Sequence, residues 1–300
     1  MRRLLALAAL AALVLAGTSA TASGTPPRTP EPVPGPHGII DDESLMQDVD
    51  CDTAQLFGPA ATSTGHVTGN EKVALDVLTL VDVAQAPKIA RDKRSQSKLF
   101  AQVRKSLLVG TQSYDPLDIA LKYDDFALLM PFEGGKPRQR TDNAQEIIAL
   151  AKQQLGGQRR ADVDVVYVVT DLDLQVPGIG RAVAGLADCI GGVALPDRAF
   201  AVGETGVLTG DEGITLGPVT FYKDLTAKIA AHEIGHLMGG HHHYQECGTA
   251  APTALGRGEP GPCTIMTNAV DFQTLPFSTL NGIVVRGHAE TWATATDPKR

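Results

Sequence analysis

Three histidines and a glutamate in the segment 232–242 have the types and spacing of a hydrolytic metal site. The segment reads HEIGHLMGGHH. His232 and His236 are four residues apart, so on a helix both imidazoles lie on one face and can bind the same ion. Gly239 can end that helix in a left-handed conformation and turn the chain back, which lets His242 supply a third nitrogen. Three imidazoles suit Zn²⁺ and leave its fourth position for water, as in catalytic zinc sites.

Glu233 directly follows the first predicted ligand. Its carboxylate can act as general base toward a zinc-activated water and then pass the proton to a leaving amine. We therefore expect a zinc metalloendopeptidase that hydrolyses peptide bonds. Two alternatives stay open, a zinc amidase or cell-wall peptide hydrolase and a non-catalytic zinc-binding protein. Glu233 argues against the second, because a structural zinc site needs no base and is closed by a fourth ligand.

The neighbours of the third predicted ligand are also histidines. His241 and His243 flank His242 directly. We interpret both as exposed polar neighbours, and a shift of the third ligand to one of them remains an alternative.

Apolar periodicity predicts the elements that must position these side chains. The first two histidines fall on a predicted helix over residues 221–238. The alternation of strands and helices before it predicts an α/β fold with a mostly parallel twisted sheet and packed helices. Ser278 is expected to cap a last helix, with Phe277, Leu280 and Val284 on its apolar face. The predicted strands span residues 73–83, 117–130, 163–170 and 200–202, and the other predicted helices span 89–109 and 144–155.

The beginning of the chain has a different composition. Residues 1–22 combine a basic start, an apolar run and a small-residue cleavage site, which is typical of a secretory signal peptide. The protein is therefore expected to be secreted into an extracellular, oxidising environment. Residues 23–66 are rich in proline near their start and are interpreted as an extended N-terminal arm or a short propeptide. The remaining residues, 67–300, are expected to form the metalloprotease domain.

Composition narrows the possible partners. The formal net charge is −8, with 43% hydrophobic and 20% charged residues. An acidic protein of ordinary composition is a poor candidate for binding nucleic acid or an anionic membrane. No segment after the first 22 residues is long and apolar enough for a stable membrane anchor. We expect a monomer that acts on protein or peptide substrates.

The extended motif, together with the segment Cys263–Met266, resembles the metzincin clan of zinc endopeptidases. It is most similar to the adamalysin (reprolysin) group, as a bacterial, secreted, stand-alone catalytic domain. The resemblance implies a zincin fold with a small C-terminal subdomain, in which Met266 forms a turn beneath the metal. It also implies an extended substrate along an edge strand, for which residues 199–204 are the candidate. One departure is His243, which stands where adamalysins usually have Asp.

The four cysteines all follow the predicted signal peptide, so two disulfides are expected. Adamalysin-type metzincins often have a bridge near the Met-containing turn, and Cys247 and Cys263 bracket the loop between that turn and the third ligand. This resemblance pairs Cys247 with Cys263 and leaves Cys51 for Cys189. The alternative is that Cys51 is a free thiolate that caps the zinc in a latent form.

Overall fold

The computed structural model describes the parts of the chain that contain the predicted strands and the metal motif. The chain divides into two compact units, residues 1–31 and 32–300, and all described residues belong to the second. The predicted signal peptide lies outside the described residues, as does the predicted arm except for Cys51. None of the helices in the described part combines the length and apolar character that a membrane crossing requires. The described residues are 51, 72–176, 181–205, 215–216, 219–242, 264–267 and 276–293.

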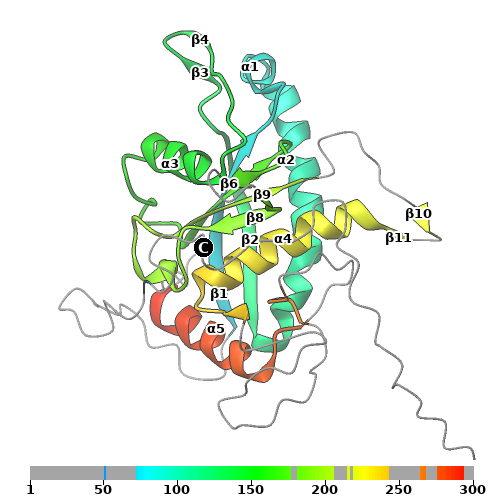
Figure 1. Ribbon diagram of the computed structural model, residues 1–300, viewed down its shortest axis with the longest axis vertical. Helices are drawn as coiled ribbons and strands as arrows, with labels where there is room; N and C mark the ends of the chain where they lie inside the picture. Colours follow the sequence, from blue (N-terminus) through cyan, green and yellow to red (C-terminus); the bar gives the residue numbers. More distant parts are fainter. Residues whose placement is uncertain are drawn as a thin grey trace, which may run out of the picture. The chain divides into compact units, whose positions relative to one another are not determined.

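A five-stranded sheet forms the centre of this unit (Figure 1). Its strand order is β2-β1-β5-β9-β8; the first four strands are parallel, and β8 pairs antiparallel with β9. Strand β5 is buried along its whole length, as its branched apolar sequence VVYVVT requires of an inner parallel strand. The prediction of an α/β fold with a mostly parallel sheet is confirmed. The strands are β1 (Val73–Asp82), β2 (Ile119–Leu128), β5 (Val165–Thr170), β8 (Gly185–Ala187) and β9 (Phe200–Glu204).

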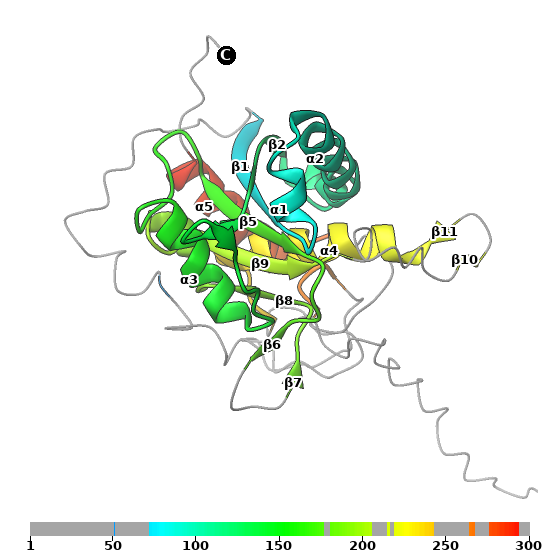
Figure 2. The same cartoon turned by 90° about the horizontal axis from the view of Figure 1, so that it is seen from above.

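Helices cover both faces of the sheet (Figure 2). Helix α3 lies on one face, where the Lys152 ammonium is 5.7 Å from the centre of the Phe200 ring of β9. Helix α4 lies on the other face, because a Cβ added to Gly203 of β9 would be 2.6 Å from Ile229 Cγ2. Helix α2 packs against α4. The helices are α1 (Ala86–Ile89), α2 (Lys93–Leu107), α3 (Ala144–Gln154), α4 (Phe221–Leu237) and α5 (Thr279–Trp292).

Three of these helices are preceded by a residue whose short polar side chain caps the helix N-terminus. Asp92 accepts a hydrogen bond from the backbone N–H of Arg94 at the start of α2, and Asn143 does the same for Gln145 at the start of α3. Ser278 caps α5, as predicted, by accepting from the N–H of Asn281 at 3.1 Å. Each of these bonds satisfies a backbone donor that the first helical turn leaves without a partner.

The predicted apolar face of the last helix is wrong in one position. Leu280 is 49% exposed, whereas Phe277, Val285 and Ala289 are buried. The helix begins at Thr279 and turns its buried stripe through Val285 and Ala289, which are one helical turn apart. Leu280 falls outside this stripe and faces away from the core.

The predicted edge strand is also wrong. Strand β9, which covers most of residues 199–204, is paired on both sides, with β5 and with β8. The edge strand beside α4 is β8, whose sequence GLA is too short and too small to give a periodic signal.

The remaining elements are short. They are the 3-10 helices η2 (Leu108–Ser113), η3 (Asp115–Leu117) and η4 (Gly192–Ala194), and the two-residue strands β3 (Phe132–Glu133), β4 (Lys136–Pro137), β6 (Gln175–Val176), β7 (Arg181–Ala182), β10 (Thr215–Leu216) and β11 (Val219–Thr220).

Candidate metal centre

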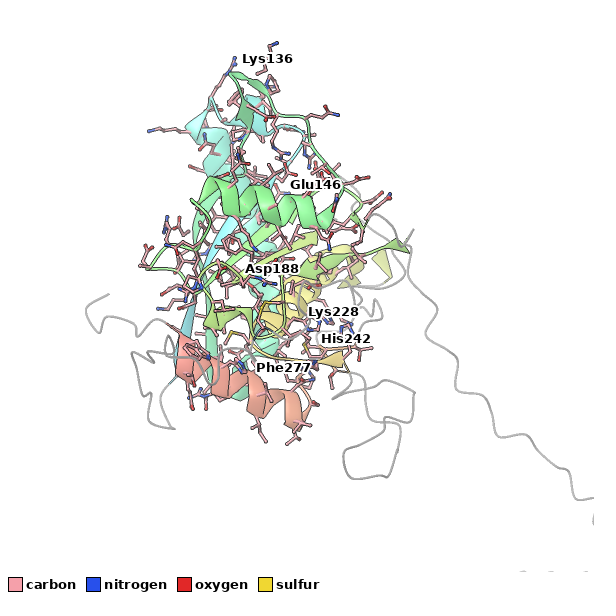
Figure 3. All side chains as sticks on the ribbon, turned by 60° about the vertical axis from the view of Figure 1, so that its left-hand side comes forward. Lys136, Glu146, Asp188, Lys228, His242 and Phe277 are labelled. Atoms are coloured by element: carbon pink, nitrogen blue, oxygen red, sulfur yellow. A yellow bond between two sulfur atoms is a disulfide. The ribbon has the colours of Figure 1, made fainter. Side chains whose placement is uncertain are left out.

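The three histidines of the motif converge at the C-terminal end of α4. Their Nε2 atoms are 3.1 Å apart between His232 and His236, and 3.1 Å apart between His236 and His242. The third separation, between His232 and His242, is 3.0 Å. His232 and His236 are fully buried, and His242 is half-buried. In Figure 3, His242 lies between α4 and α5, with Phe277 toward α5.

Backbone carbonyl groups orient the first two rings. His232 Nδ1 is 2.6 Å from the carbonyl oxygen of Ile265, and His236 Nδ1 is 2.7 Å from that of Gly240. A carbonyl oxygen only accepts hydrogen bonds, so Nδ1 must carry the hydrogen in both rings. In a neutral imidazole this leaves a lone pair on Nε2, which is the atom that points to the common centre.

This donor set fits a zinc ion. A tetrahedral zinc with bonds of about 2.0–2.1 Å to nitrogen separates its ligand atoms by about 3.3 Å. The separations of 3.0–3.1 Å in the structure are close to that value. Converging lone pairs repel one another unless a cation lies between them, and imidazole suits zinc as a ligand. The three residues can therefore hold a metal ion.

Gly239 ends α4 and returns the chain toward the centre. It has a φ of +83°, in the left-handed region that favours glycine. Its N–H donates to the carbonyl of His236 at 2.9 Å, and the N–H of Gly240 donates to the carbonyl of Gly235 at 2.8 Å. This pair of bonds is the Schellman motif, which terminates helices at glycine. The turn brings His242 back to the two histidines of the helix.

A turn at residues 264–267 lies directly beneath the end of α4. It is closed by a bond of 3.1 Å from the N–H of Thr267 to the carbonyl of Thr264. Met266 in this turn is fully buried. A Cβ added to Gly235 would lie 2.6 Å from Met266 Sδ, so the thioether packs against the helix between His232 and His236, where only glycine fits.

Glu233 is fully buried between α4 and the edge strand β8. Gly185 of β8 faces it so closely that an added Cβ would overlap the Glu233 carboxylate, 2.8 Å from its Cδ. The charge of Glu233 also acts on two buried phenols, those of Tyr167 and Tyr114. Burial raises the pKa of Tyr167 and of Tyr114 well above the ordinary value, and the charge of Glu233 raises both further. Both tyrosines therefore stay neutral near Glu233.

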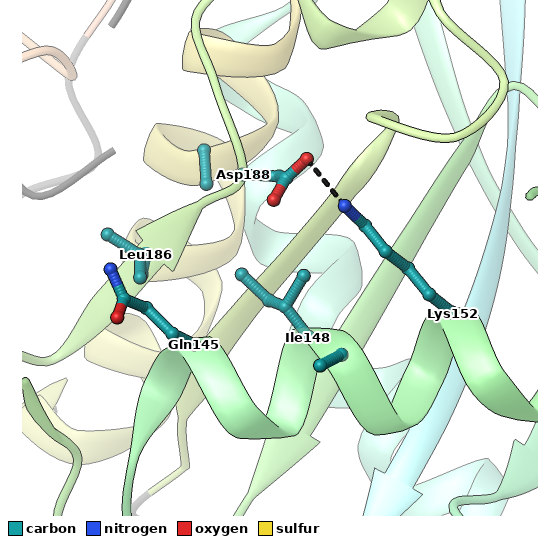
Figure 4. Close-up of a pocket in the computed structure, with 7 residues that line it drawn as sticks. Gln145, Ile148, Lys152, Leu186 and Asp188 are labelled. Atoms are coloured by element: carbon teal, nitrogen blue, oxygen red, sulfur yellow. Dashed lines mark hydrogen bonds and ion pairs between the residues drawn. The ribbon is translucent and has the colours of Figure 1, made fainter. Parts of the chain in front are cut away.

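The opposite side of β8 carries a separate small cavity (Figure 4). It has a volume of about 180 Å³ and lies between β8 and α3, away from the histidines. Asp188 closes one end through ion pairs with Lys152, at 2.9 Å, and with Arg198. The lining residues are Gln145, Ile148, Ala149, Lys152, Leu186, Ala187 and Asp188.

A disulfide joins Cys51 to Cys189, the pairing expected from the sequence, with 5.8 Å between the Cα atoms. Cys51 is therefore not a free thiolate. Its N–H also donates to the carbonyl of Ile190 at 2.9 Å, and the N–H of Gly191 donates to the carbonyl of His236 at 2.8 Å. The disulfide thus lies next to a loop that contacts α4, the helix that carries His232 and His236. The other two cysteines, 247 and 263, and residue 243 lie outside the described residues.

Several contributors to the centre were not found from the sequence. The carbonyl groups of Ile265 and Gly240 leave no mark on residue type, because every residue has one. Gly185 belongs to a strand without a periodic signal. Asn281, which binds the backbone of His241, carries no sequence signal of its own, because its partner lies 40 positions away in the chain.

Comparison with known proteins relates this site to a family. Residues 121–243 match the family described as metallo-peptidase family M12B, reprolysin-like. A comparison with curated proteins gave no match. Among solved structures, a chain from "Structure of a chaperone-substrate complex" is similar, with a TM-score of 0.40 and 14% identity. The similarity covers 74% of this chain and only 36% of that one, and is too low to bear on fold or function.

The family match covers the three histidines and Glu233 but not the turn at residues 264–267 or α5. Residues 121–243 include α3, β5, the edge strand β8, α4 with His232 and His236, and the loop with His242. The match supports a zinc-dependent peptidase, an activity that would act on proteins or peptides. Across this segment the chain is therefore similar to the reprolysin-like metallopeptidases of family M12B.

Proposed function

We propose that the protein is a secreted zinc endopeptidase in which His232, His236 and His242 hold the metal and Glu233 is the general base. The observation that carries this proposal is the convergence of the three Nε2 atoms within 3.1 Å of one another. Glu233 follows the first histidine on the same helix and lies against the edge strand.

The residues of the centre divide the chemistry between them. When bound, zinc supplies Lewis-acid chemistry, which polarises a peptide carbonyl and acidifies water. Glu233 accepts a proton from the water as the oxygen attacks the carbonyl carbon. Glu233 then gives this proton to the amide nitrogen as the C–N bond breaks, so the carboxylate is regenerated. The carbonyls of Ile265 and Gly240 keep His232 and His236 in the tautomer that binds metal.

We place the substrate as an extended peptide along β8. One side of β8 pairs with β9, and its other side is the edge of the sheet. A peptide added to this edge would form main-chain hydrogen bonds with β8. Because Gly185 of β8 touches the Glu233 carboxylate, such a peptide would bring a scissile bond near the base. The proposed Met-containing turn at Met266 would support the ligands from below.

Secretion and a monomeric state complete the proposal. Residues 1–22 have the composition of a signal peptide. The Cys51–Cys189 disulfide agrees with an oxidising compartment.

The proposal is tested by digesting an unbiased peptide library with the zinc-loaded protein and reading the cut sites by mass spectrometry. We expect internal cuts that disappear on chelation and return when zinc is restored. Glu233→Gln, loaded with zinc in parallel, should give no cuts above background. Cleavage of cross-linked cell-wall peptides alone would favour the wall hydrolase. Tight zinc binding without any hydrolysis would favour a non-catalytic protein.

A further inference from the structure

The amide side chain of Asn281 binds both backbone polar groups of His241. Asn281 Oδ1 accepts from the N–H of His241 at 2.9 Å, and Asn281 Nδ2 donates to the carbonyl oxygen of His241 at 2.9 Å. Asn281 is fully buried, although its amide is polar. A buried amide is stable only when its donors and acceptor are satisfied, so these two bonds fix its place in α5.

His241 lies between two groups that the metal centre depends on. The residue before it, Gly240, supplies the carbonyl that orients His236. The residue after it, His242, supplies the third nitrogen. Holding the backbone of His241 therefore also holds the Gly240 carbonyl group before it and the backbone of His242 after it.

Helix α5 is a firm support for this contact. Ser278 caps the helix by accepting from the N–H of Asn281 itself. One turn further along, α5 packs against the glycine that ends α4: a Cβ on Gly239 would be 2.9 Å from Val284 Cγ1 and 2.6 Å from His288 Cε1. The end of α4 and the loop that follows it thus pack against the same face of α5.

We propose that Asn281 is a positioning residue for the third metal ligand. Its amide holds the His241 backbone so that His242 is presented to the other two histidines before metal binds. This inference rests on the proposed function, in which the three histidines hold zinc. Without the amide, the loop that carries His242 would be ordered only when metal binds. The free energy of ordering it would then be lost from the binding free energy, so zinc affinity would fall. Groups that orient ligands in this way typically contribute 10–100-fold to metal affinity or activity.

The residue type fits this role. Only an amide side chain offers a donor and an acceptor side by side, as both groups of His241 require. Aspartate offers acceptors alone at neutral pH, and leucine has a similar size without either group. Both substitutions keep a side chain of similar size and change its hydrogen bonding, so their effects report on the hydrogen bonds rather than on packing.

The test compares Asn281→Leu and Asn281→Asp with Asn143→Ala. Asn143 is a matched control, because its side chain binds the backbone N–H groups of Gln145 and Glu146 on the opposite face of the sheet. Zinc affinity is measured by competition with a chromophoric chelator. The visible spectrum of the cobalt-substituted protein reports the ligand geometry, and chemical unfolding of the zinc-free protein reports stability.

We expect Asn281→Leu to weaken zinc binding by about 10–100-fold and to alter the cobalt spectrum. Asn281→Asp should weaken zinc binding less, because it keeps the acceptor for the His241 N–H. Asn143→Ala should lower stability and leave zinc affinity and the cobalt spectrum unchanged. Unchanged zinc affinity in Asn281→Leu would overturn the proposal, as would failure of both Asn281 variants to fold with zinc present. If the unaltered protein bound no zinc through the three histidines, the proposed function itself would fail.

Discussion

His232 Nδ1 lies 2.6 Å from the carbonyl oxygen of Ile265, a residue 33 positions later in the chain. The first proposed ligand on α4 is therefore oriented by the turn at residues 264–267. The second proposed ligand, His236, is oriented by the loop that follows α4, through Gly240. The metal motif is contiguous in sequence, but the groups that set its geometry are not.

Replacing Glu233 with glutamine should abolish turnover and leave the fold and zinc content unchanged. Glutamine has the same shape but cannot accept the proton from water. Loss of a general base typically costs 10²–10⁴-fold in rate. The measurement is kcat on a quenched fluorescent peptide, with metal content determined on the same sample. Retention of more than about a tenth of the rate would show that Glu233 is not the base.

Gly185→Ala should impair catalysis more than metal binding. The new Cβ would overlap the Glu233 carboxylate and would lie 2.8 Å from Ile229 Cγ2, so the base must move. We expect kcat to fall by about tenfold or more with zinc affinity preserved, since a misplaced catalytic group readily costs 10²-fold. Gly287→Ala is the control, because nothing lies within 4 Å of a Cβ at that position. Equal activity of the two variants would contradict the position of Glu233 against β8.

The identity of the third ligand can be tested by comparing His242→Ala with His241→Ala. His242 Nε2 lies at the common centre, whereas His241 is bound through its backbone, which alanine retains. We expect His242→Ala to lose tight zinc binding and His241→Ala to keep it, as measured by chelator competition. In the wild type, one zinc per molecule should be removable by chelators, with loss of activity. The reverse ranking of the two variants would move the ligand to His241.

Because of Glu204, the free energy of unfolding should fall as pH rises. It is 7% exposed, and burial raises its pKa to about 8, against the opposing effect of its bond from the N–H of Leu174. Between its unfolded pKa near 4.5 and the folded value, the folded protein binds one more proton than the unfolded chain. Stability due to this group is thus present in full below pH 4.5 and is lost by up to about 1.4 kcal/mol per pH unit as pH rises to 8.

Glu204→Gln replaces the titratable carboxyl group with an amide that does not titrate. The free energy of unfolding of this variant should therefore depend less on pH. Urea unfolding at pH 5 and pH 8 measures the effect. The exposed Glu133→Gln serves as the control and should behave like the wild type. A wild-type pH dependence that survives in Glu204→Gln would assign it to other groups.

Cys247 and Cys263 are predicted to form the second disulfide. Peptide mapping under non-reducing conditions should recover them as one linked pair. Closing a loop of about 15 residues stabilises the folded state by roughly 3 kcal/mol in the chain-entropy model. The double variant Cys247→Ser/Cys263→Ser should unfold at lower denaturant concentration by a corresponding amount. Recovery of either cysteine as a free thiol would contradict the pairing.

The sequence predicted those parts of the structure that depend on local pattern. The long buried strands and the helices gave periodic signals, and the strand β5 and helix α4 lie where they were expected. The convergence of the histidines followed from helical spacing and from one glycine, Gly239, whose positive φ the turn requires. These features depend on near neighbours in the chain.

The features that were missed depend on distant contacts. Strand order cannot be read from periodicity, so β9 was taken for the edge although β8 occupies it. The contact between Asn281 and His241 joins residues 40 positions apart and leaves no pattern in either segment. The exposure of Leu280 depends on how α5 rotates against the end of α4.

The Cys51–Cys189 disulfide has a consequence for maturation by proteolysis. If a protease cuts any single peptide bond between these two cysteines, both fragments stay joined through sulfur. A segment that ends with Cys51 would therefore travel with the enzyme as a light chain, and its loss would require a second cut or a reductant. On a denaturing gel, such a nicked protein would run as one species without reductant and as two species with it.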